Sequence, residues 1–556
     1  MKEIRENIKF LYPDREQEIL EEIDNIIVHY KNIVSYADFD LKENDVVLIA
    51  YADSFKDENE SGLQTLNKVC NEYLKNSINT IHILPFYPFT SDDGFSVVDY
   101  KKVNKDFGNW DDVVDLGKNF HLMFDAVINH ISKSSDWFQG YLKEDPQFEN
   151  FFIEENPEHP DLSKVVRPRT LPLLHRYDKN GKEAFVWTTF SEDQVDLNYQ
   201  NPKVFLKVLD VLLFYISKGA KLIRLDAIAF MWKIIGTSCI HLEQTHRIIQ
   251  TYRKIIDLVA PQTVLITETN VPHEENISYF GDGFNEAHMV YNFTLPPLLA
   301  YSLHNENISI LTNWAKALQL PSNKTCFFNF TASHDGIGVR PLQGIVSVEE
   351  INGLAEKAES HGGFVSYKSN PDGSKSPYEL NCNYMDLLTD PKESDELRTQ
   401  RFLLTQSVMI CMPGVPGVYY HSVFGSENDV QAVIDSGINR RINRQKLLYT
   451  DLKKKLENKE SLRAKIYNWY TSLLKIRIAE KAFNPMGKAK YFNENNVFVI
   501  ERTYEDETIY CLHNFSNEEK SIKSFAITSG NIISQGERAD ILKPFEFKWF
   551  KRLNER

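Results

Sequence analysis

The sequence is poor in cysteine, and its cysteines are not closely spaced. Only six of the 556 residues are cysteine, no two of them form a Cys-x-x-Cys pair, and several lie in apolar runs. Zinc sites and disulfide frameworks are recognised by close cysteine spacing. The pattern therefore predicts buried thiols in a reducing compartment, and we expect a cytoplasmic protein.

Long apolar runs and an excess of positive charge are also missing. No stretch approaches the roughly 20 apolar residues of a membrane-spanning helix, and the polar start at residues 1–6 is unlike a signal peptide. The formal net charge is −15, which argues against nucleic acids and anionic membranes as partners. The hydrophobic share of 42% and the charged share of 25% are those of an ordinary globular protein.

The sequence has no internal repeat, no low-complexity tract and no glycine-rich turn after its first predicted strand. The missing turn argues against a dinucleotide-binding dehydrogenase. A chain of 556 residues exceeds what one hydrophobic core supports. We therefore expect one large domain with one or two smaller ones.

Strand-like and helix-like patterns alternate from residue 46 onward. Helical patterns, such as those at 203–217 and 242–259, separate most of the strands. This alternation predicts an α/β fold, a (β/α)8 TIM barrel. A doubly wound open sheet is the structural alternative, because counting strands does not exclude it. The apolar runs that predict buried strands are 46–50, 80–85, 122–128, 221–227, 264–267, 289–293, 326–330 and 415–420.

Several segments outside the strands have patterns of their own. The start of the chain has helical spacing, two intervals are too long for simple loops, and the apolar period changes to two near the end. Long ordered insertions usually carry function. The expected domains are an N-terminal helical extension at 1–45, a catalytic barrel at 46–130 and 201–485, an inserted domain at 131–200, a mobile loop insertion after the seventh strand at 336–385, and a C-terminal antiparallel β domain at 486–556.

Polar side chains stand at the C-terminal ends of the predicted strands, where barrel enzymes carry their active sites. A lone His or Asp after a strand is more often a cap or a solvated loop residue, and Asp125 within the third strand is expected to be structural. Their shared chemistry at one end of the barrel favours a common site. They are Asp92, Asn129, His130, Arg224, Asp226, Glu268, His334 and Asp335.

Three of these carboxylates suit the cleavage of a glycosidic bond, which needs one ionised and one protonated carboxyl group. Arg224 lies two residues before Asp226, on the same side of a strand, and would keep it ionised as a nucleophile. Glu268 follows an apolar strand, where desolvation raises a carboxyl pKa for proton donation. Asp335, beside His334, would stabilise the developing positive charge.

Two aromatic residues and the missing ligand clusters complete this interpretation. Phe95 and Phe190 can stack on the apolar face of a sugar ring, although either is equally compatible with the core. No His-rich ligand set is present, so we expect no metal and no cofactor.

Four ordered motifs resemble those of glycoside hydrolase family 13, the α-amylase family. The resemblance covers about residues 46–556 and implies a TIM barrel with an inserted B domain and a C-terminal β domain. It also implies a retaining reaction with Asp226 as nucleophile, Glu268 as acid/base and Asp335 as stabiliser. The motifs are Asp125-Ala126-Val127-Ile128-Asn129-His130, Ile223-Arg224-Leu225-Asp226-Ala227, Ile266-Thr267-Glu268 and Ser333-His334-Asp335.

Within that family the chain is similar to the sucrose phosphorylase group. The likeness implies an α-glucoside and inorganic phosphate as substrates, with Asp92 and Arg444 on the far hydroxyls of the glucosyl unit. It implies that His130, Arg224 and His334 line the same pocket. It places Arg167, Arg169 and Tyr378 near phosphate, whereas without it Arg167-Pro168-Arg169 is an ordinary solvated loop. The likeness rests on segments such as Arg167-Pro168-Arg169, His334-Asp335-Gly336-Ile337-Gly338 and Arg441-Ile442-Asn443-Arg444.

The chain departs from sucrose phosphorylases at positions that face the aglycone. Asn270 and Phe230 replace a His and a Tyr, and Glu379 replaces a Gln in the segment Tyr378-Glu379-Leu380-Asn381. Length and these segments resemble the glucosylglycerate phosphorylase branch, which implies D-glycerate as the aglycone. Sucrose 6′-phosphate phosphorylase, sucrose phosphorylase and an α-glucosidase or transglucosidase remain alternatives. The oligomeric state stays open, with a homodimer as one alternative.

Overall fold

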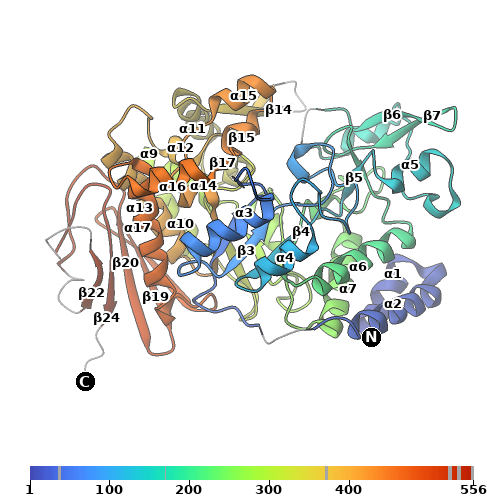
Figure 1. The fold of residues 1–556 in the computed structure, drawn as a ribbon, viewed down its shortest axis with the longest axis horizontal. Helices are drawn as coiled ribbons and strands as arrows, with labels where there is room; N and C mark the ends of the chain where they lie inside the picture. Colours follow the sequence, from blue (N-terminus) through green and yellow to red (C-terminus); the bar gives the residue numbers. More distant parts are fainter. Residues whose placement is uncertain (36–38, 169–170, 370–373, 524–528, 535–539, 553–556) are drawn as a thin grey trace.

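Eight parallel strands form a closed barrel at the centre of the chain (Figure 1). The computed structural model describes residues 1–35, 39–168, 171–369, 374–523, 529–534 and 540–552. The first and last strands pair in parallel, which closes the barrel. The predicted TIM barrel is therefore confirmed, and the open doubly wound sheet is excluded. In order around the barrel the strands are β1 (Val47–Ala50), β3 (Thr80–Ile83), β4 (His121–Ala126), β9 (Ala220–Leu225), β10 (Val264–Thr267), β11 (Met289–Tyr291), β12 (Cys326–Phe330) and β16 (Val415–Tyr419).

The barrel strands are short and almost wholly buried, as expected for parallel strands that helices cover from outside. Two charges interrupt this apolar interior, Asp125 on β4 and Arg224 on β9, and they are direct register partners. Helices return the chain between strands; α6, for example, starts with Pro202 after the capping side chain of Asn201. The covering helices include α3 (Gly62–Val69), α4 (Trp110–Gly117), α6 (Pro202–Ser217), α7 (Glu243–Val259), α9 (Leu295–His304), α10 (Ser309–Ala317), α13 (Asp395–Cys411) and α17 (Leu462–Arg477).

The N-terminal segment forms two helices, α1 (Lys2–Leu11) and α2 (Glu16–Lys31). They pack on α7 and α6 at the end of the molecule opposite to the C-terminal sheet (Figure 1). The Tyr12 hydroxyl donates a hydrogen bond to the carbonyl of Tyr199, which ties this pair to the segment before α6. These helices therefore extend the outer layer of the barrel.

The interval between β4 and β9 builds a small structure beside the barrel. The hairpin β6–β7 is antiparallel, and β5 pairs with β8. The buried Lys233 ammonium binds Asp196 of β8 at 2.7 Å and the Asn129 side chain at 3.1 Å, so this structure is anchored to the loop after β9. Its elements are β5 (His130–Ser132), α5 (Asp136–Leu142), β6 (Leu174–Lys179), β7 (Lys182–Trp187) and β8 (Gln194–Asp196).

The segment after β12, expected to be a loop insertion, contains a helix and an antiparallel sheet. The sheet has the strand order β13-β15-β14, and β15 also contacts the 3-10 helix Asn439–Asn443. The elements are β13 (Ile337–Gly338), α11 (Val348–Ser360), β14 (Phe364–Ser369), β15 (Lys375–Asn381) and α12 (Tyr384–Leu388).

The C-terminal part is a five-stranded antiparallel sheet that contacts α10 and α13. Arg502 of β19 is buried against α13 and donates a hydrogen bond to the Cys411 carbonyl at 2.8 Å. The strands, in spatial order, are β18 (Lys488–Glu494), β19 (Val497–Tyr504), β20 (Glu507–Asn514), β24 (Phe547–Arg552) and β22 (Ser529–Ser534).

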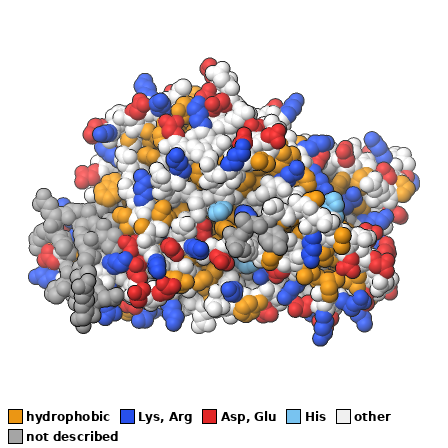
Figure 2. Space-filling view, turned by 60° about the horizontal axis from the view of Figure 1, so that its bottom comes forward, with side chains coloured by type: hydrophobic (Ala, Val, Ile, Leu, Met, Phe, Trp, Pro, Cys, Tyr) orange, Lys and Arg blue, Asp and Glu red, His pale blue; other side chains and the backbone are white. Residues whose placement is uncertain are grey.

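Three properties of the whole chain bear on the predictions from composition. All six cysteines are buried and unpaired. Within the described ranges, no helix has the length and apolar character to cross a membrane. Basic and acidic side chains are interspersed over the face shown in Figure 2.

Candidate active site

A cavity of about 780 Å³, its mouth included, opens at the C-terminal ends of the barrel strands. Side chains from the 131–200 and 336–385 segments complete its wall, among them Pro168 and Tyr378. The structure brings eleven of the predicted site residues to the lining. They are Asp92, Phe95, His130, Phe190, Asp226, Glu268, Asn270, His334, Asp335, Tyr378 and Glu379.

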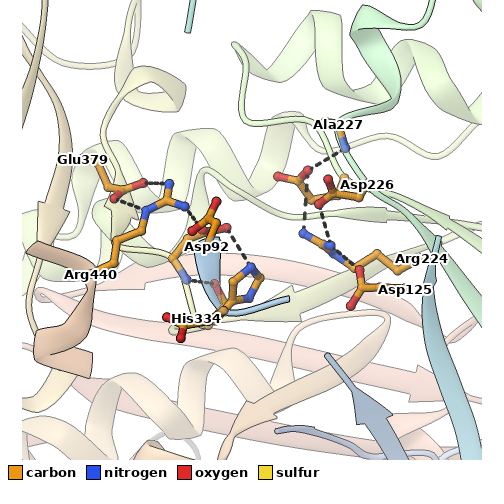
Figure 3. Close-up of polar contacts among 12 residues, drawn as sticks. Asp92, Asp125, Arg224, Asp226, Ala227, His334, Glu379 and Arg440 are labelled. Atoms are coloured by element: carbon orange, nitrogen blue, oxygen red, sulfur yellow. Dashed lines mark hydrogen bonds and ion pairs between the residues drawn. The ribbon is translucent and has the colours of Figure 1, made fainter. Parts of the chain in front are cut away.

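One buried guanidinium, that of Arg224, contacts carboxylates from three neighbouring strands (Figure 3). Its Nη1 donates hydrogen bonds to Asp125 and to Asp226 Oδ1, the latter at 2.8 Å, and its Nη2 lies 3.7 Å from Glu268 Oε2. Arg224 is only 2% exposed, and a buried charge of this kind requires compensating charges. The ion-pair network therefore fixes Asp226 and Glu268 against one another at the cavity floor.

The backbone after β9 strengthens this arrangement. Ala227 has a φ of +50°, a left-handed conformation that is costly for a residue other than glycine. In this conformation its N–H donates a hydrogen bond to Glu268 Oε2 at 3.1 Å. Strained backbone at such a position is typical of functional sites. Here it lets the residue after Asp226 donate its N–H to the Glu268 carboxylate.

Asp226 and Glu268 titrate as a pair. Burial raises the pKa of both carboxyl groups, Arg224 opposes the rise, and the negative charge of Glu268 raises the pKa of Asp226 further. Both carboxyl groups therefore hold a proton to higher pH than a solvated carboxyl group does. Arg224 lies closer to Asp226 than to Glu268, at 2.8 Å against 3.7 Å, so the stronger pairing with the cation is that of Asp226.

Asp335 has the opposite electrostatic environment. Burial alone would raise the pKa of its carboxyl group, but Arg440 and Arg444 outweigh burial and hold that pKa well below the usual value. Arg440 Nη1 lies 2.6 Å from Asp335 Oδ1, and Arg444 Nη2 lies 3.8 Å from the same atom. Asp335 is therefore permanently ionised at the cavity wall.

Aromatic and neutral groups form another part of the wall. The rings of Phe95 and His334 stack at a centroid distance of 4.5 Å, and Phe190 packs at 5.3 Å from the ring of His130. Burial lowers the pKa of His334 to about 3, so its imidazole is neutral. Its buried Nδ1 has no hydrogen-bond partner in the described part of the chain.

The turn after β3 contributes two carboxylates with left-handed backbone, Asp92 at φ +51° and Asp93 at φ +50°. The buried Arg444 donates to Asp93 at 2.8 Å and to Asp92 at 3.3 Å. Arg444 also donates from Nε to the His334 carbonyl at 2.8 Å. This arginine thus lies just behind the lining and fixes two loops that carry predicted site residues.

The 336–385 segment reaches the site through Glu379. Its carboxylate accepts two hydrogen bonds from Arg440, at 2.9 and 2.6 Å, so Arg440 bridges Glu379 and Asp335 (Figure 3). Glycines make room for these contacts. A Cβ atom on Gly336 would lie 2.5 Å from the Glu379 side chain, and one on Gly338 would lie 2.4 Å from that of Asn270.

Two residues predicted to meet phosphate or the aglycone, Arg167 and Asn381, are not on the described lining, and a third is not described. Arg167 is exposed and lies outside it, although the next residue, Pro168, is part of it. Asn381 lies two residues farther along β15 than Glu379 and donates a hydrogen bond to Ser366 Oγ at 2.9 Å. Arg169 lies outside the described residues.

Sequence reasoning missed two arginines that line the cavity, Arg340 and Arg440. Arg440 directly precedes the quoted segment Arg441–Arg444, and Arg340 follows the quoted segment His334–Gly338 by two residues. Extending each segment by two residues would have included both. No group of three or more His, Cys, Asp or Glu side chains in the described ranges is arranged to hold a metal ion.

Comparisons with known proteins agree with the fold and with the motifs. The family described as alpha amylase, catalytic domain, matches residues 49–336. The chain is similar to the glucosylglycerate phosphorylase of Escherichia coli (strain K12), 46% identical over 92% of both chains, and to that of Allomeiothermus silvanus, 44% identical over 98% of both. A crystal structure of sucrose 6F-phosphate phosphorylase from Thermoanaerobacter thermosaccharolyticum superposes with a TM-score of 0.75 at 25% identity and covers 86% of this chain and 96% of its own.

Proposed function

The chain belongs to the α-amylase family, and on that premise we propose that it is a retaining glycoside phosphorylase. It cleaves an α-glucoside with inorganic phosphate and yields α-D-glucose 1-phosphate. The names of the relatives at 44–46% identity favour 2-O-α-glucosylglycerate as the glucoside, with D-glycerate as the other product. The observation that carries the reaction class is the Asp226–Glu268 pair that one buried guanidinium holds at the floor of the cavity.

In the first step the ionised Asp226 attacks the anomeric carbon while Glu268 gives its proton to the departing glycerate oxygen. A β-glucosyl ester forms on Asp226, and Glu268 is left as a carboxylate. In the second step an oxygen of hydrogen phosphate attacks the anomeric carbon from the vacated face. Its proton passes to Glu268, the ester bond to Asp226 breaks, and the starting state of the enzyme returns.

The remaining lining residues fit a glucosyl unit in this position. The ionised Asp335 would stabilise positive charge that develops at the anomeric centre. Asp92 and the neutral imidazole of His334 would accept or donate hydrogen bonds to sugar hydroxyls, and Phe95 would lie beneath the ring. Tyr378 enters from the 336–385 segment, on the side where the aglycone and phosphate exchange.

The direct test is the reverse reaction. α-Glucose 1-phosphate with D-glycerate should release inorganic phosphate. Release with fructose or fructose 6-phosphate but not with D-glycerate would overturn the proposed acceptor. Release of glucose from an α-glucoside without any need for phosphate would identify a hydrolase.

Sucrose 6′-phosphate phosphorylase is the second candidate function, because a solved structure of that enzyme superposes over 86% of this chain. Both candidates release an anionic aglycone. We further propose a cytoplasmic location, which the six buried, unpaired thiols support. A homodimer stays a prediction that light scattering of the purified protein tests.

A further inference from the structure

The cavity lining carries more negative than positive charge. Five carboxylates line it, and two arginines, Arg340 and Arg440, are the cations among the described lining residues. An anionic aglycone entering this cavity would be repelled unless a cation met it. The carboxylates are Asp92, Asp226, Glu268, Asp335 and Glu379.

Arg440 is already paired. It makes two hydrogen bonds to Glu379 and a 2.6 Å ion pair with Asp335. A guanidinium fork satisfied by two carboxylates has little capacity left for an incoming anion. Arg440 therefore balances charge within the wall.

Arg340 is in a different state. In the described part of the chain its ion pair is with Glu275 Oε2 at 4.0 Å, beyond hydrogen-bond distance. Glu275 is 45% exposed, and the same oxygen is contacted by His241 Nε2 at 3.1 Å. The Arg340 side chain is 18% exposed. It faces the cavity with most of its donors available.

A second cation stands near Arg340 and points to the same conclusion. Lys368 on β14 makes no ion pair with a carboxylate in the described ranges, and burial and the charge of Arg340 both lower the pKa of its ammonium group. Two neighbouring like charges are unfavourable until an anion comes between or beside them. Lys368 itself is not among the described residues of the cavity lining.

Asn270 connects this positive region to the acid. It follows Glu268 by two residues, and its side chain fills the space above Gly338, which precedes Arg340 by two residues. Asn270 Oδ1 is buried and has no hydrogen-bond partner among the described residues. Glu268, Asn270 and Arg340 all line the same cavity.

We propose that Arg340 recognises the carboxylate of the aglycone, with Asn270 on an aglycone hydroxyl. This inference rests on the proposed function, because the phosphorylase reaction is what brings an aglycone to Glu268. D-glycerate has the matching chemistry: a carboxylate next to the carbon whose oxygen carries the glucosyl bond, and a further hydroxyl group. Arg340 is thus a specificity-determining residue with no part in bond breaking.

The test compares two acceptors that differ in one charged group. Glycerol has a hydroxymethyl group where D-glycerate has its carboxylate. With α-glucose 1-phosphate as donor, Arg340→Gln should lower kcat/KM for D-glycerate by about 10- to 100-fold, the effect of one charged hydrogen-bonded contact, and leave glycerol unchanged. Arg340→Lys should recover part of the loss, because it keeps the charge without the guanidinium fork.

A third arm separates the carboxylate from phosphate. With α-D-glucosyl fluoride as donor, formation of glucose 1-phosphate reports on phosphate alone, and its KM for phosphate should be the same in wild type and Arg340→Gln. The matched control is Lys357→Gln, an exposed cation on α11 of the same segment, which should leave all three arms unchanged.

Equal losses with D-glycerate and glycerol, or a raised KM for phosphate, would overturn the assignment of Arg340. A wild-type enzyme that is inactive with D-glycerate but active with fructose 6-phosphate would instead overturn the proposed acceptor. The Arg340 comparison then moves to fructose 6-phosphate against fructose. A loss confined to the phosphorylated sugar supports an anion-recognising Arg340, and a loss with both sugars refutes it.

Discussion

The two halves of the cavity position their charges by different means. On the strand side, Asp226 and Glu268 follow β9 and β10 directly, and their N–H groups donate to the Ala126 and Leu225 carbonyls at 3.1 and 3.2 Å. On the side of the 336–385 segment, Glu379 stands on β15, which pairs with β13 and β14, and its carboxylate pairs with Arg440. Asp226 and Glu268 thus follow strands of the closed barrel, whereas Glu379 stands on a small sheet outside the barrel.

This difference predicts the largest effect at Asp226. Asp226→Asn keeps the shape and removes the anionic nucleophile, so kcat/KM should fall by about 10⁴-fold or more for every donor. Rates with the natural glucoside and with α-D-glucosyl fluoride measure the loss. A smaller loss than that caused by Glu379→Gln would reverse the ranking of the two halves.

Arg440→Met tests the junction between the halves. The substitution leaves Asp335 and Glu379 without their shared cation, so we expect about 100-fold lower kcat/KM and about 3 kcal/mol lower stability. Arg440 lowers the pKa of Asp335, and this contribution to stability is present above the ordinary carboxyl pKa and is lost as the pH falls through the lowered value. The difference in the free energy of unfolding between wild type and Arg440→Met should therefore be largest at neutral pH and become smaller in acid.

A matched control for Arg440 is Arg401→Met. Arg401, on α13, forms an ion pair with Glu393 at 3.0 Å. Its side chain is 24% exposed, close to the 21% of Arg440. It should lose stability in thermal or denaturant unfolding but keep kcat/KM. Equal kinetic losses in the two variants would show that Arg440 acts only through folding.

The pH profile tests the proton assignment on the strand side. Burial raises the pKa of Glu268, so its acid form persists above the ordinary carboxyl range, and kcat/KM for a glucoside should fall about tenfold per pH unit above the raised value. Fluoride needs little protonation to leave, so the fall of kcat/KM at high pH should be weaker with α-D-glucosyl fluoride as donor. It should also be weaker in Glu268→Gln. An unchanged fall in Glu268→Gln would show that another group causes it.

The smallest effect is expected on the acceptor side at Gly338. A Cβ atom there would press on the Asn270 side chain, so Gly338→Ala should raise KM for D-glycerate by about threefold, as a displaced polar contact would. The rate with α-D-glucosyl fluoride and phosphate should be the same in Gly338→Ala and in the wild type. The matched control is Gly353→Ala on α11, where a Cβ atom meets nothing within 4 Å; it should leave kinetics unchanged and slightly stabilise the helix.

The strand side is also the part that the sequence predicts best. Asp226 and Glu268 stand out because charged residues interrupt or end apolar runs, and a strand fixes where its next residue points. The register between Asp125 and Arg224 brings together residues 99 positions apart. The local sequence pattern is sufficient to predict these positions, because strands that follow one another in the chain are neighbours in the closed barrel.

The acceptor side depends on tertiary contacts that no local pattern encodes. Arg440 lies in a short 3-10 helix, and only the folding of β15 against it reveals its pairing with Glu379. Asn381 lies two residues after Glu379 on the same strand, so the alternation along the strand predicts the same face for both. Its side chain donates a hydrogen bond to Ser366 instead, and it is not among the described residues of the cavity lining. The expected loop at 336–385 contains a helix and a sheet, since polar, glycine-containing composition does not exclude a small antiparallel sheet.

The glycine at 338 has a consequence for the shape of the cavity wall. Its missing side chain leaves a space that residue 270 fills from another loop, so residue 270 can change size while the path of the chain after β12 stays the same. A substitution at residue 270 can therefore reshape this part of the cavity wall while the strand ends that carry Asp226 and Glu268 keep their places.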